Sequence, residues 1–313
     1  MSFSKRSKVN ILKKLMELYR TLMQIGNDLD KIRQTLGRIE KRQLVARAPV
    51  KFLDHEYQVY SQWGEDGLIQ HILSRVNVAD RIFVEFGVEK YTESNTRFLL
   101  INDNWSGLVI DGSAENINHI KNDPIYWKYN LKAECSFIDS QNINNIIKRN
   151  GISGDIGLLS IDVDGNDYYI FESIDVISPR IIVCEYNSLW GDNLSVSVPY
   201  DPLFVRGNAH YSSLYFGASI NALTNLAAKK GYSLVGSNSI GANIFFVRND
   251  LLAEIEVVTP KEVYVQCKFR QSRGPSGELT FLNFAESLSL LADMDLMDVE
   301  NGKLHKIRDL LVG

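Results

Sequence analysis

The chain has 313 residues, 45% of them apolar, and a formal net charge of −4. This length and composition are typical of one large or two modest globular domains with a sizeable buried core. No stretch reaches the roughly 18 uninterrupted apolar residues of a membrane span. We expect no secretory signal, because no apolar segment follows the Lys-rich start.

Charge is distributed unevenly along the chain. The first 50 residues carry twelve Lys and Arg against four acidic residues, which leaves the remainder with a net charge of −12. An acidic body argues against extended nucleic-acid binding. Cys135, Cys184 and Cys267 have no paired spacing, which disfavours a disulfide or a metal site and favours a reducing cytoplasm.

The first predicted element is a basic helix within residues 1–48. Its apolar residues alternate in steps of four and three, the spacing of a coiled-coil seam. We expect self-association through residues 11–39 as a trimer or tetramer, because leucine at a and isoleucine at d disfavour a parallel dimer. The alternative is an amphipathic helix packed on its own domain. The seam consists of Ile11, Leu15, Leu18, Leu22, Ile25, Leu29, Ile32, Leu36 and Ile39.

Basic residues crowd the tip of this helix. They allow contact with an anionic membrane surface, which would place the protein at the inner face of the membrane, or they form a solvated terminus. The residues concerned are Lys5, Arg6, Lys8, Lys13 and Lys14.

A main domain is predicted over residues 49–252, and it begins with a short helix around 68–73. Ser61 is placed to cap this helix. Gln62, with Trp63, Glu65 and Asp66, is a candidate to close over a bound cofactor, although capping and solvent-facing roles explain these residues equally well.

A strand, helix, strand unit follows, with strands at 81–87 and 107–111 and a helix at 94–101. An acid that ends the second strand of such a unit, here Asp111, can hold the ribose hydroxyls of a nucleoside. The first turn has one glycine and several acids, which repel a pyrophosphate. S-adenosylmethionine therefore suits this turn better than NAD does; the alternative is an ordinary turn with exposed acids.

Acidic residues also follow the later strands. Strands are predicted at 133–139, 157–163 and 180–187, with a helix at 143–149, and they bring Asp162, Asp164, Glu185 and Asn187 to one sheet edge. Clustered carboxylates raise one another's pKa and serve as a general base, or they share a divalent cation such as Mg²⁺. Turn chemistry alone is the competing explanation.

The domain closes with an irregular stretch at 188–212, which contains His210, a helix at 214–230, and strands at 232–237 and 242–248. The last two strands form a predicted antiparallel hairpin at the sheet edge. We therefore predict an α/β fold: a Rossmann-like, seven-stranded methyltransferase sheet whose last strand is antiparallel.

Residues 253–313 are predicted to form a helical extension, with a packed helix pair over 279–311. The loop from Arg270 to Gly277 carries two arginines. It either clamps an anionic sugar or phosphate or is a polar connection.

Several motifs occur together between Tyr57 and Leu252, and their combination resembles the FkbM-type methyltransferases. They are Ser61-Gln-Trp-Gly-Glu-Asp-Gly67, Phe83-Val-Glu-Phe-Gly87, Glu93-Ser-Asn-Thr96, Gly107-Leu-Val-Ile-Asp-Gly-Ser113, Ile161-Asp-Val-Asp-Gly-Asn-Asp167, Glu185-Tyr-Asn187 and Phe216-Gly-Ala-Ser219.

This resemblance implies an S-adenosylmethionine-dependent O-methyltransferase of polysaccharide or glycoconjugate assembly. It implies that Glu85 and Gly87 line the methionine portion of the cofactor, Asp111 the ribose, and Asp139 the adenine; Ser113 is a further cofactor-binding candidate. Asp162 would lie beside the methyl group. The chain departs from the commoner family pattern by carrying Asp164-Gly165 where Glu-Gly is usual.

The sequence thus predicts methyl transfer to a hydroxyl of a sugar or glycan intermediate. Asp164, Glu185 and His210 are the candidate bases. Asp162, Asp164, Glu185 and Asn187 are the candidate metal ligands. The alternatives are a non-catalytic coiled-coil scaffold of a glycan-assembly complex and a metal-dependent glycosyltransferase, because Asp162-Val-Asp164 superficially resembles a metal and nucleotide-sugar motif.

Overall fold

The computed structural model describes residues 5–46, 51–268 and 272–310. The chain divides into two compact units, Met1–Pro49 and Val50–Gly313, which we call the arm and the body. Each unit is described by itself. Among the described residues, no helix has the length and apolar character needed to cross a membrane.

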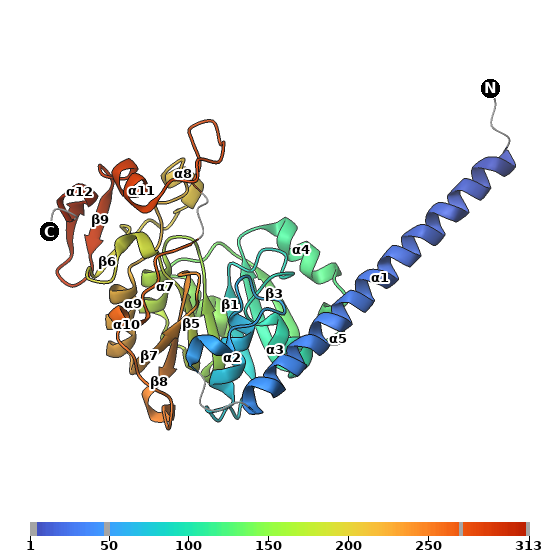
Figure 1. The fold of residues 1–313 in the computed structure, drawn as a ribbon, viewed down its shortest axis with the longest axis horizontal. Helices are drawn as coiled ribbons and strands as arrows, with labels where there is room; N and C mark the ends of the chain where they lie inside the picture. The colour runs from blue at the N-terminus through green and yellow to red at the C-terminus, as the bar shows by residue number, and fades with distance from the viewer. Residues whose placement is uncertain (1–4, 47–50, 269–271, 311–313) are drawn as a thin grey trace. The chain divides into compact units, whose positions relative to one another are not determined.

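The arm is one helix, α1, which spans Lys5–Ala46 (Figure 1). All nine predicted seam residues are exposed, from 41% for Ile39 to 60% for Leu29 and Leu36. Within the arm no other described element covers this apolar row. The side chains of Lys5, Arg6 and Lys8 in the basic tip, and the predicted boundary at residue 48, lie outside the described part of the chain.

The body is built on a seven-stranded sheet of order β3-β2-β1-β4-β5-β8-β7. Every neighbouring pair is parallel except those that involve β8, the last of these strands in the chain. The predicted sheet with an antiparallel last strand is therefore confirmed. The strands are β1 Ile82–Phe86, β2 Ser106–Asp111, β3 Leu131–Cys135, β4 Gly154–Ile161, β5 Ile177–Glu185, β7 Tyr232–Ser237 and β8 Asn243–Arg248.

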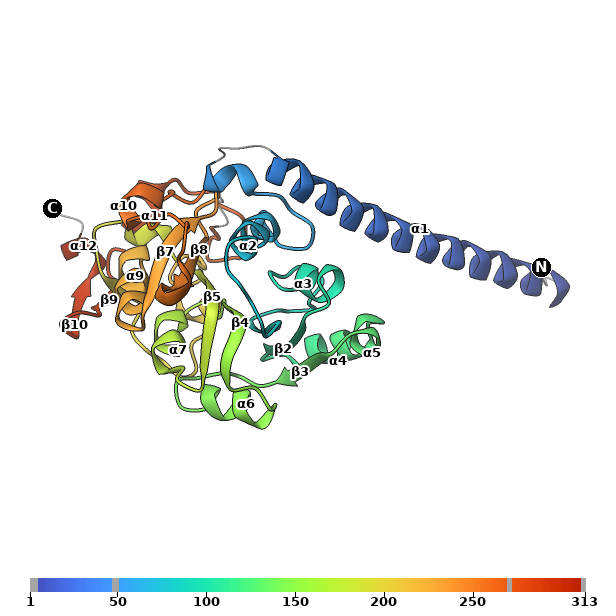
Figure 2. The same cartoon turned by 90° about the horizontal axis from the view of Figure 1, so that it is seen from below.

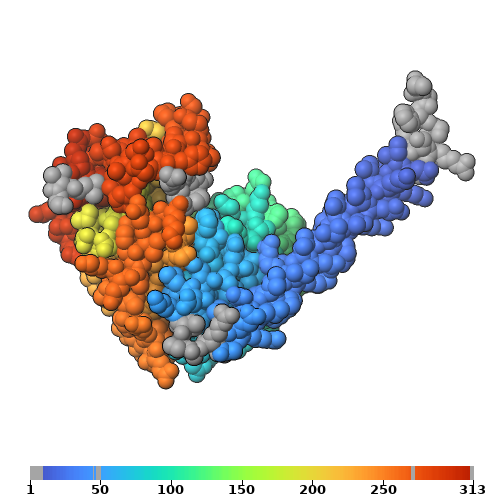
Figure 3. Space-filling model, in the orientation of Figure 1, coloured from blue at the N-terminus to red at the C-terminus, as the bar shows by residue number. Residues whose placement is uncertain are grey.

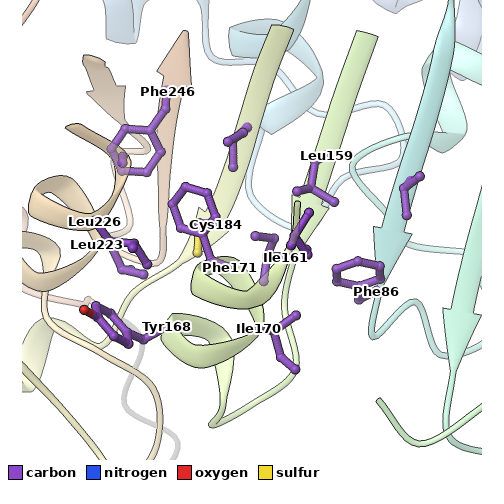
Figure 4. Close-up of a cluster of buried hydrophobic side chains, with 14 of the residues drawn as sticks. Phe86, Leu159, Ile161, Tyr168, Ile170, Phe171, Cys184, Leu223, Leu226 and Phe246 are labelled. Atoms are coloured by element: carbon purple, nitrogen blue, oxygen red, sulfur yellow. The ribbon is translucent and has the colours of Figure 1, made fainter. Parts of the chain in front are cut away.

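Helices cover both faces of the sheet (Figures 1 and 2), and each face has its own buried apolar cluster. Successive strand residues point to opposite faces, so that Ile182 and Cys184 join one cluster while Ile181 and Val183 join the other. Figure 4 shows the first cluster, where Phe171 and Phe246 pack around Cys184. Its helices are α6 Ile143–Arg149, α7 Asp167–Ser173 and α9 Ile220–Lys229; the other face carries α2 Glu65–Leu73, α3 Arg97–Asn102, α4 Ala114–Asn122 and α5 Ile125–Lys128.

Several predicted boundaries move by a few residues; β4 and β5, for example, each begin three residues earlier than predicted and end two residues earlier. The third strand ends at Cys135, so Asp139 lies in the following loop rather than at the strand end. The helix predicted at 214–230 begins at Ile220, where Ser219 Oγ accepts a hydrogen bond from Ala222 N (3.1 Å). Gly64, at a left-handed φ of 111°, is the N-cap of α2 in place of Ser61. Ser61 Oγ instead accepts from Asp66 N inside the first turn.

The predicted helix pair over 279–311 is wrong. Only short helices occur there, and β9 pairs with β10 and with β6 in a three-stranded sheet. Asp298 and Gly302, the latter at a φ of 72°, form the tight turn between β9 and β10, which helical periodicity cannot anticipate.

The remaining elements of the body are short. They are η1 Phe52–His55, η2 Ser188–Trp190, β6 Val196–Ser197, α8 Arg206–Ala209, η3 Asn249–Leu251, α10 Pro260–Val263, α11 Phe284–Leu290, β9 Asp295–Asp298, β10 Lys303–Lys306 and α12 Ile307–Leu310.

The C-terminal segments, drawn orange to red, form a continuous surface at one end of the body (Figure 3). Beneath them, Trp190 packs with Leu291, Leu296 and Ile307 in a third apolar cluster. This cluster attaches the C-terminal segments to the segment that follows β5.

Candidate active site

A cavity of about 660 Å³ lies at the carboxyl edge of the sheet. It is bounded by the loop after β1, the ends of β4 and β5, the segment 206–216 and the C-terminal segments 266–267 and 272–287. Seven of the predicted site residues line it: Gln62, Glu85, Gly87, Asp162, Asp164, Glu185 and Asn187. Asp111, Ser113, Asp139 and His210 are not among the described residues that line it.

Glu85, at the end of β1, is buried and organises the loop that starts α3. One carboxylate oxygen accepts from Asn95 N (2.8 Å), and the other accepts from Ser94 Oγ (3.1 Å) and from the backbone and side chain of Thr96. Burial raises the pKa of Glu85. Its oxygens are therefore engaged in shaping the cavity wall.

Gly87 lets the β1 loop approach β4 closely. Its φ is 67°, and a Cβ added there would lie 1.9 Å from the carbonyl oxygen of Asp162. A larger residue would push the two strand ends apart. Two residues later, Glu89 N donates to Asp111 Oδ2 (2.8 Å), which joins this loop to the end of β2.

Asp111 accepts three hydrogen bonds from its own chain, from Glu89 N, Ser113 N (2.8 Å) and Asn116 Nδ2 (3.0 Å). A carboxylate offers about four acceptor positions, so about one remains for a ligand. Ser113 caps α4. Beside this turn Phe137 is 48% exposed and lies next to Gly112.

Asp139 stabilises the start of α6. Its Oδ1 accepts from Gln141 N and Asn142 N (both 2.8 Å), and its Oδ2 accepts from Asn142 Nδ2 (3.0 Å). The structure thus gives the predicted adenine-binding acid a helix-capping role.

Three carboxylates meet where β4 and β5 end. Asp162, Asp164 and Glu185 each offer an oxygen within 4.8 Å of the others, and we call them the acid cluster. Glu185 Oε2 is buried and has no hydrogen-bond partner among the described residues. Burial, and then the charge of Asp164, raises the pKa of Asp162 well above its ordinary value. Burial, and then Asp162, does the same to the pKa of Glu185.

Neighbouring polar residues hold this edge in shape. Asp167 is buried and accepts from Val163 N (2.8 Å) and Gly165 N (3.0 Å), which fixes the loop after β4; burial raises its pKa to about 6. Asn187 Nδ2 donates to the carbonyls of Leu214 and Phe216 (both 3.0 Å), and its Oδ1 accepts from Leu189 N. The amide of Asn187 is therefore occupied, and the structure does not present it as a metal ligand.

Arg206, which the sequence interpretation missed, reaches the acid cluster from α8. Its Nη1 lies 2.6 Å from Asp164 Oδ1, and its Nε donates to the carbonyl of Ser213 (2.6 Å). The guanidinium carbon lies 3.6 Å from the centre of the Phe216 ring. A single arginine in an irregular stretch offered no signal, because its partner Asp164 is 42 residues away.

His210 does not join the acid cluster. Its Nδ1 lies 2.7 Å from Ser212 Oγ and accepts from Ser212 N (3.2 Å), and its ring stacks on Tyr211. Burial lowers the pKa of His210. The hydrogen bonds to Ser212 hold the imidazole against its own loop. This geometry therefore does not support the predicted role of His210 as the base.

Glu65 and Asp66 have structural roles. Glu65 Oε1 accepts from Asn238 Nδ2 (2.7 Å) and Asn243 Nδ2 (2.9 Å), which ties α2 to the turn between β7 and β8. Asp66 Oδ2 accepts from three successive backbone amides, those of residues 59–61, and burial raises its pKa to about 6.

The C-terminal segment supplies the far wall of the cavity. Gln266, Arg273, Asn283 and Ser287 line it. Arg273 Nη1 donates to the carbonyl of Gly277 (3.0 Å), and Arg270, the other arginine of the predicted clamp, lies outside the described residues.

Comparisons with known proteins give remote likenesses. No family model matches the chain, and no curated protein matches it. Among solved structures, the N-terminal domain of EvdMO1 with SAH bound is 10% identical with a TM-score of 0.38, over 59% of this chain and 80% of that one. An S-adenosylmethionine-dependent methyltransferase from Clostridium acetobutylicum is 10% identical with a TM-score of 0.39, over 68% and 98%. PKMT2 from Rickettsia typhi is 10% identical with a TM-score of 0.41, over 62% and 55%.

Proposed function

We propose that this protein is an S-adenosylmethionine-dependent O-methyltransferase that acts on a hydroxyl group of a sugar or glycan intermediate. The observation that carries the proposal is that Glu185 lines the cavity at the carboxyl edge of the sheet, and that its buried Oε2 has no hydrogen-bond partner among the described residues. Ligands of open α/β sheets bind at this edge. A carboxylate oxygen free of protein partners can accept the proton of a bound hydroxyl.

The residues around the β1 loop fit the cofactor. Gly87 lets the β1 loop pack closely against the end of β4 at the cavity edge, Asp111 retains acceptor capacity, and the exposed ring of Phe137 offers a surface on which an adenine can stack. When bound, S-adenosylmethionine supplies a methyl group attached to a positively charged sulfur. The acidic side chains at the strand ends favour such a cation over a phosphate.

The protein's contribution to the reaction is positioning and proton removal. Glu185 takes the hydroxyl proton, and its raised pKa makes the ionised carboxylate a stronger base than an exposed one. Polar side chains that line the cavity, among them Gln62, Gln266 and Ser287, suit a ligand rich in hydroxyl groups.

The acid cluster suits the predicted Mg²⁺ ion less well than the β1 loop suits S-adenosylmethionine. The acid cluster offers three oxygen donors, but the Arg206 guanidinium already occupies Asp164, and Asn187 is engaged elsewhere. We therefore derive no step that involves a metal ion.

Calorimetric titration of the full chain with S-adenosylhomocysteine tests the proposal. Saturable binding at one site is expected. A thermal shift with a sugar nucleotide, and none with S-adenosylhomocysteine, would instead favour a glycosyltransferase. Binding of neither compound would favour the scaffold.

A further inference from the structure

We propose that Arg206 is the built-in cation of the acid cluster, and that it keeps a divalent metal ion out of a site whose carboxylates would otherwise bind one. This inference concerns the electrostatics of the cavity and is independent of the methyl-transfer proposal.

The acid cluster needs a positive charge. Three carboxylate oxygens within 4.8 Å of one another repel strongly in a partly buried site, and each added charge of the same sign makes ionisation of the next harder. Oxygen donors at such spacing are also the kind that Mg²⁺ and Mn²⁺ prefer. A cation is therefore expected there, supplied either by solution or by the protein.

Arg206 is built to be that cation. The hydrogen bond from its Nε to the Ser213 carbonyl and the contact of its guanidinium with Phe216 orient Nη1 toward Asp164. The Arg206 side chain is 26% exposed, less than the 57% of Asp164. Because these two partners already orient the planar guanidinium, the arginine loses little further freedom when it pairs with Asp164.

Asp164 also has a constrained backbone. Its φ is 56°, in the left-handed region that side-chain-bearing residues rarely adopt. In this conformation its carboxylate meets Arg206 while remaining within reach of Asp162 and Glu185. A metal ion at the acid cluster would have to displace Arg206 from Asp164 or share that carboxylate with a positive charge.

The test is metal titration of the full chain, with Mn²⁺ followed by calorimetry and by electron paramagnetic resonance. We expect no saturable Mn²⁺ binding by the unaltered protein. Arg206→Met, which keeps an apolar stem over Phe216 and removes the charge, should bind one Mn²⁺ saturably, with a Kd at least roughly tenfold below the highest Mn²⁺ concentration that fails to saturate the unaltered protein, because a repelling charge has left the site. Adding Asp164→Asn to Arg206→Met should abolish the gained binding.

Two matched variants complete the experiment. Arg273→Met removes an arginine that lines the same cavity without contacting the acid cluster, so it should behave like the unaltered protein. Arg206→Lys keeps the charge and should also remain free of Mn²⁺. Thermal melting checks that each variant is folded.

Two results would overturn the proposal. One is saturable Mn²⁺ binding by the unaltered protein that Asp164→Asn removes, because the metal would then coexist with Arg206 or displace it. The other is a folded Arg206→Met protein that still binds no Mn²⁺, because the acid cluster would then not depend on Arg206 for its positive charge.

Discussion

At the scale of single residues, carboxylates that look alike in the sequence have different roles. Glu85, Asp111 and Asp139 accept hydrogen bonds from their own chain and shape loops. Glu185 keeps an unpartnered buried oxygen, and Asp164 pairs with an arginine. The number of hydrogen bonds that the protein donates to each carboxylate decides between these roles. A carboxylate that already accepts hydrogen bonds from several amides has little capacity left for a ligand.

Glu185→Gln provides a residue-scale prediction with two separate readouts. If Glu185 removes the hydroxyl proton, methyl transfer should fall by about 10²–10⁴-fold while S-adenosylhomocysteine affinity stays nearly unchanged. The second readout is stability against pH. Because burial and the neighbouring acids raise the pKa of Glu185 in the folded state, folding takes up a proton between the ordinary and the raised pKa. Stability therefore falls as pH rises through this window.

As the pH rises above the ordinary pKa of glutamate, the melting temperature of Glu185→Gln should therefore fall less than that of the unaltered protein. Glu172→Gln, at an exposed position of α7, is the matched control and should leave both activity and the melting profile unchanged. If the melting temperatures of Glu185→Gln and of the unaltered protein change equally with pH, the pKa of Glu185 is not raised in the folded state. Parallel loss of turnover and cofactor affinity would assign Glu185 to binding.

At the scale of elements, α1 presents more apolar surface than a two-stranded seam needs. Besides the nine seam residues, a second apolar row follows in the N-terminal half at steps of four, three and four. A helix that contacts two neighbours uses a wider apolar face than a helix that contacts one. The second row consists of Leu12, Met16, Tyr19 and Met23, which are 49–64% exposed.

We therefore propose that copies of α1 associate in parallel as a trimer or tetramer. In that arrangement Asp28, at g, faces Arg33, at the following e position of a neighbouring copy, with opposite charge. Leu22→Glu with Leu29→Glu places two charges in the seam and should give a monomer by sedimentation equilibrium. The matched control is Asn27→Glu with Gln34→Glu, on the opposite helix face, which should keep the oligomer. A monomeric unaltered protein would refute the proposal.

At the scale of the whole molecule, the arm and the body have separate structural requirements. All four buried apolar clusters consist of body residues, and the residues that line the cavity begin at Gln62. α1 has no apolar core of its own, and an isolated helix gains little stability without packing. The body is therefore expected to fold without the arm, whereas the arm depends on association.

Deletion of residues 1–49 should leave a body that melts cooperatively at nearly the temperature of the full chain, because no buried cluster is lost. Its affinity for S-adenosylhomocysteine should stay within about twofold of the full chain's, since every described residue that lines the cavity belongs to the body. Calorimetry and circular dichroism measure both quantities. An unfolded body would show that the body depends on the arm for stability, and selective loss of S-adenosylhomocysteine binding by a folded body would show that the arm contributes to the site.

The sequence by itself determined the features that depend on neighbouring residues. Apolar runs predicted the strands and α6, the four-three spacing predicted α1, and the acids after β4 and β5 were expected at one sheet edge, where the structure finds Asp162, Asp164 and Glu185 together. Local periodicity suffices for these, because it records which side of an element is buried.

Tertiary structure alone decided what each polar group contacts. Arg206 meets Asp164 across 42 residues, Asn187 meets Phe216 across 29, and the β9–β10 hairpin pairs with β6 about a hundred positions earlier in the chain. The His210 ring contacts Ser212 in its own loop and does not reach the acid cluster. Such contacts depend on chain folding over long separations, and residue type or spacing does not encode which donor will reach which acceptor.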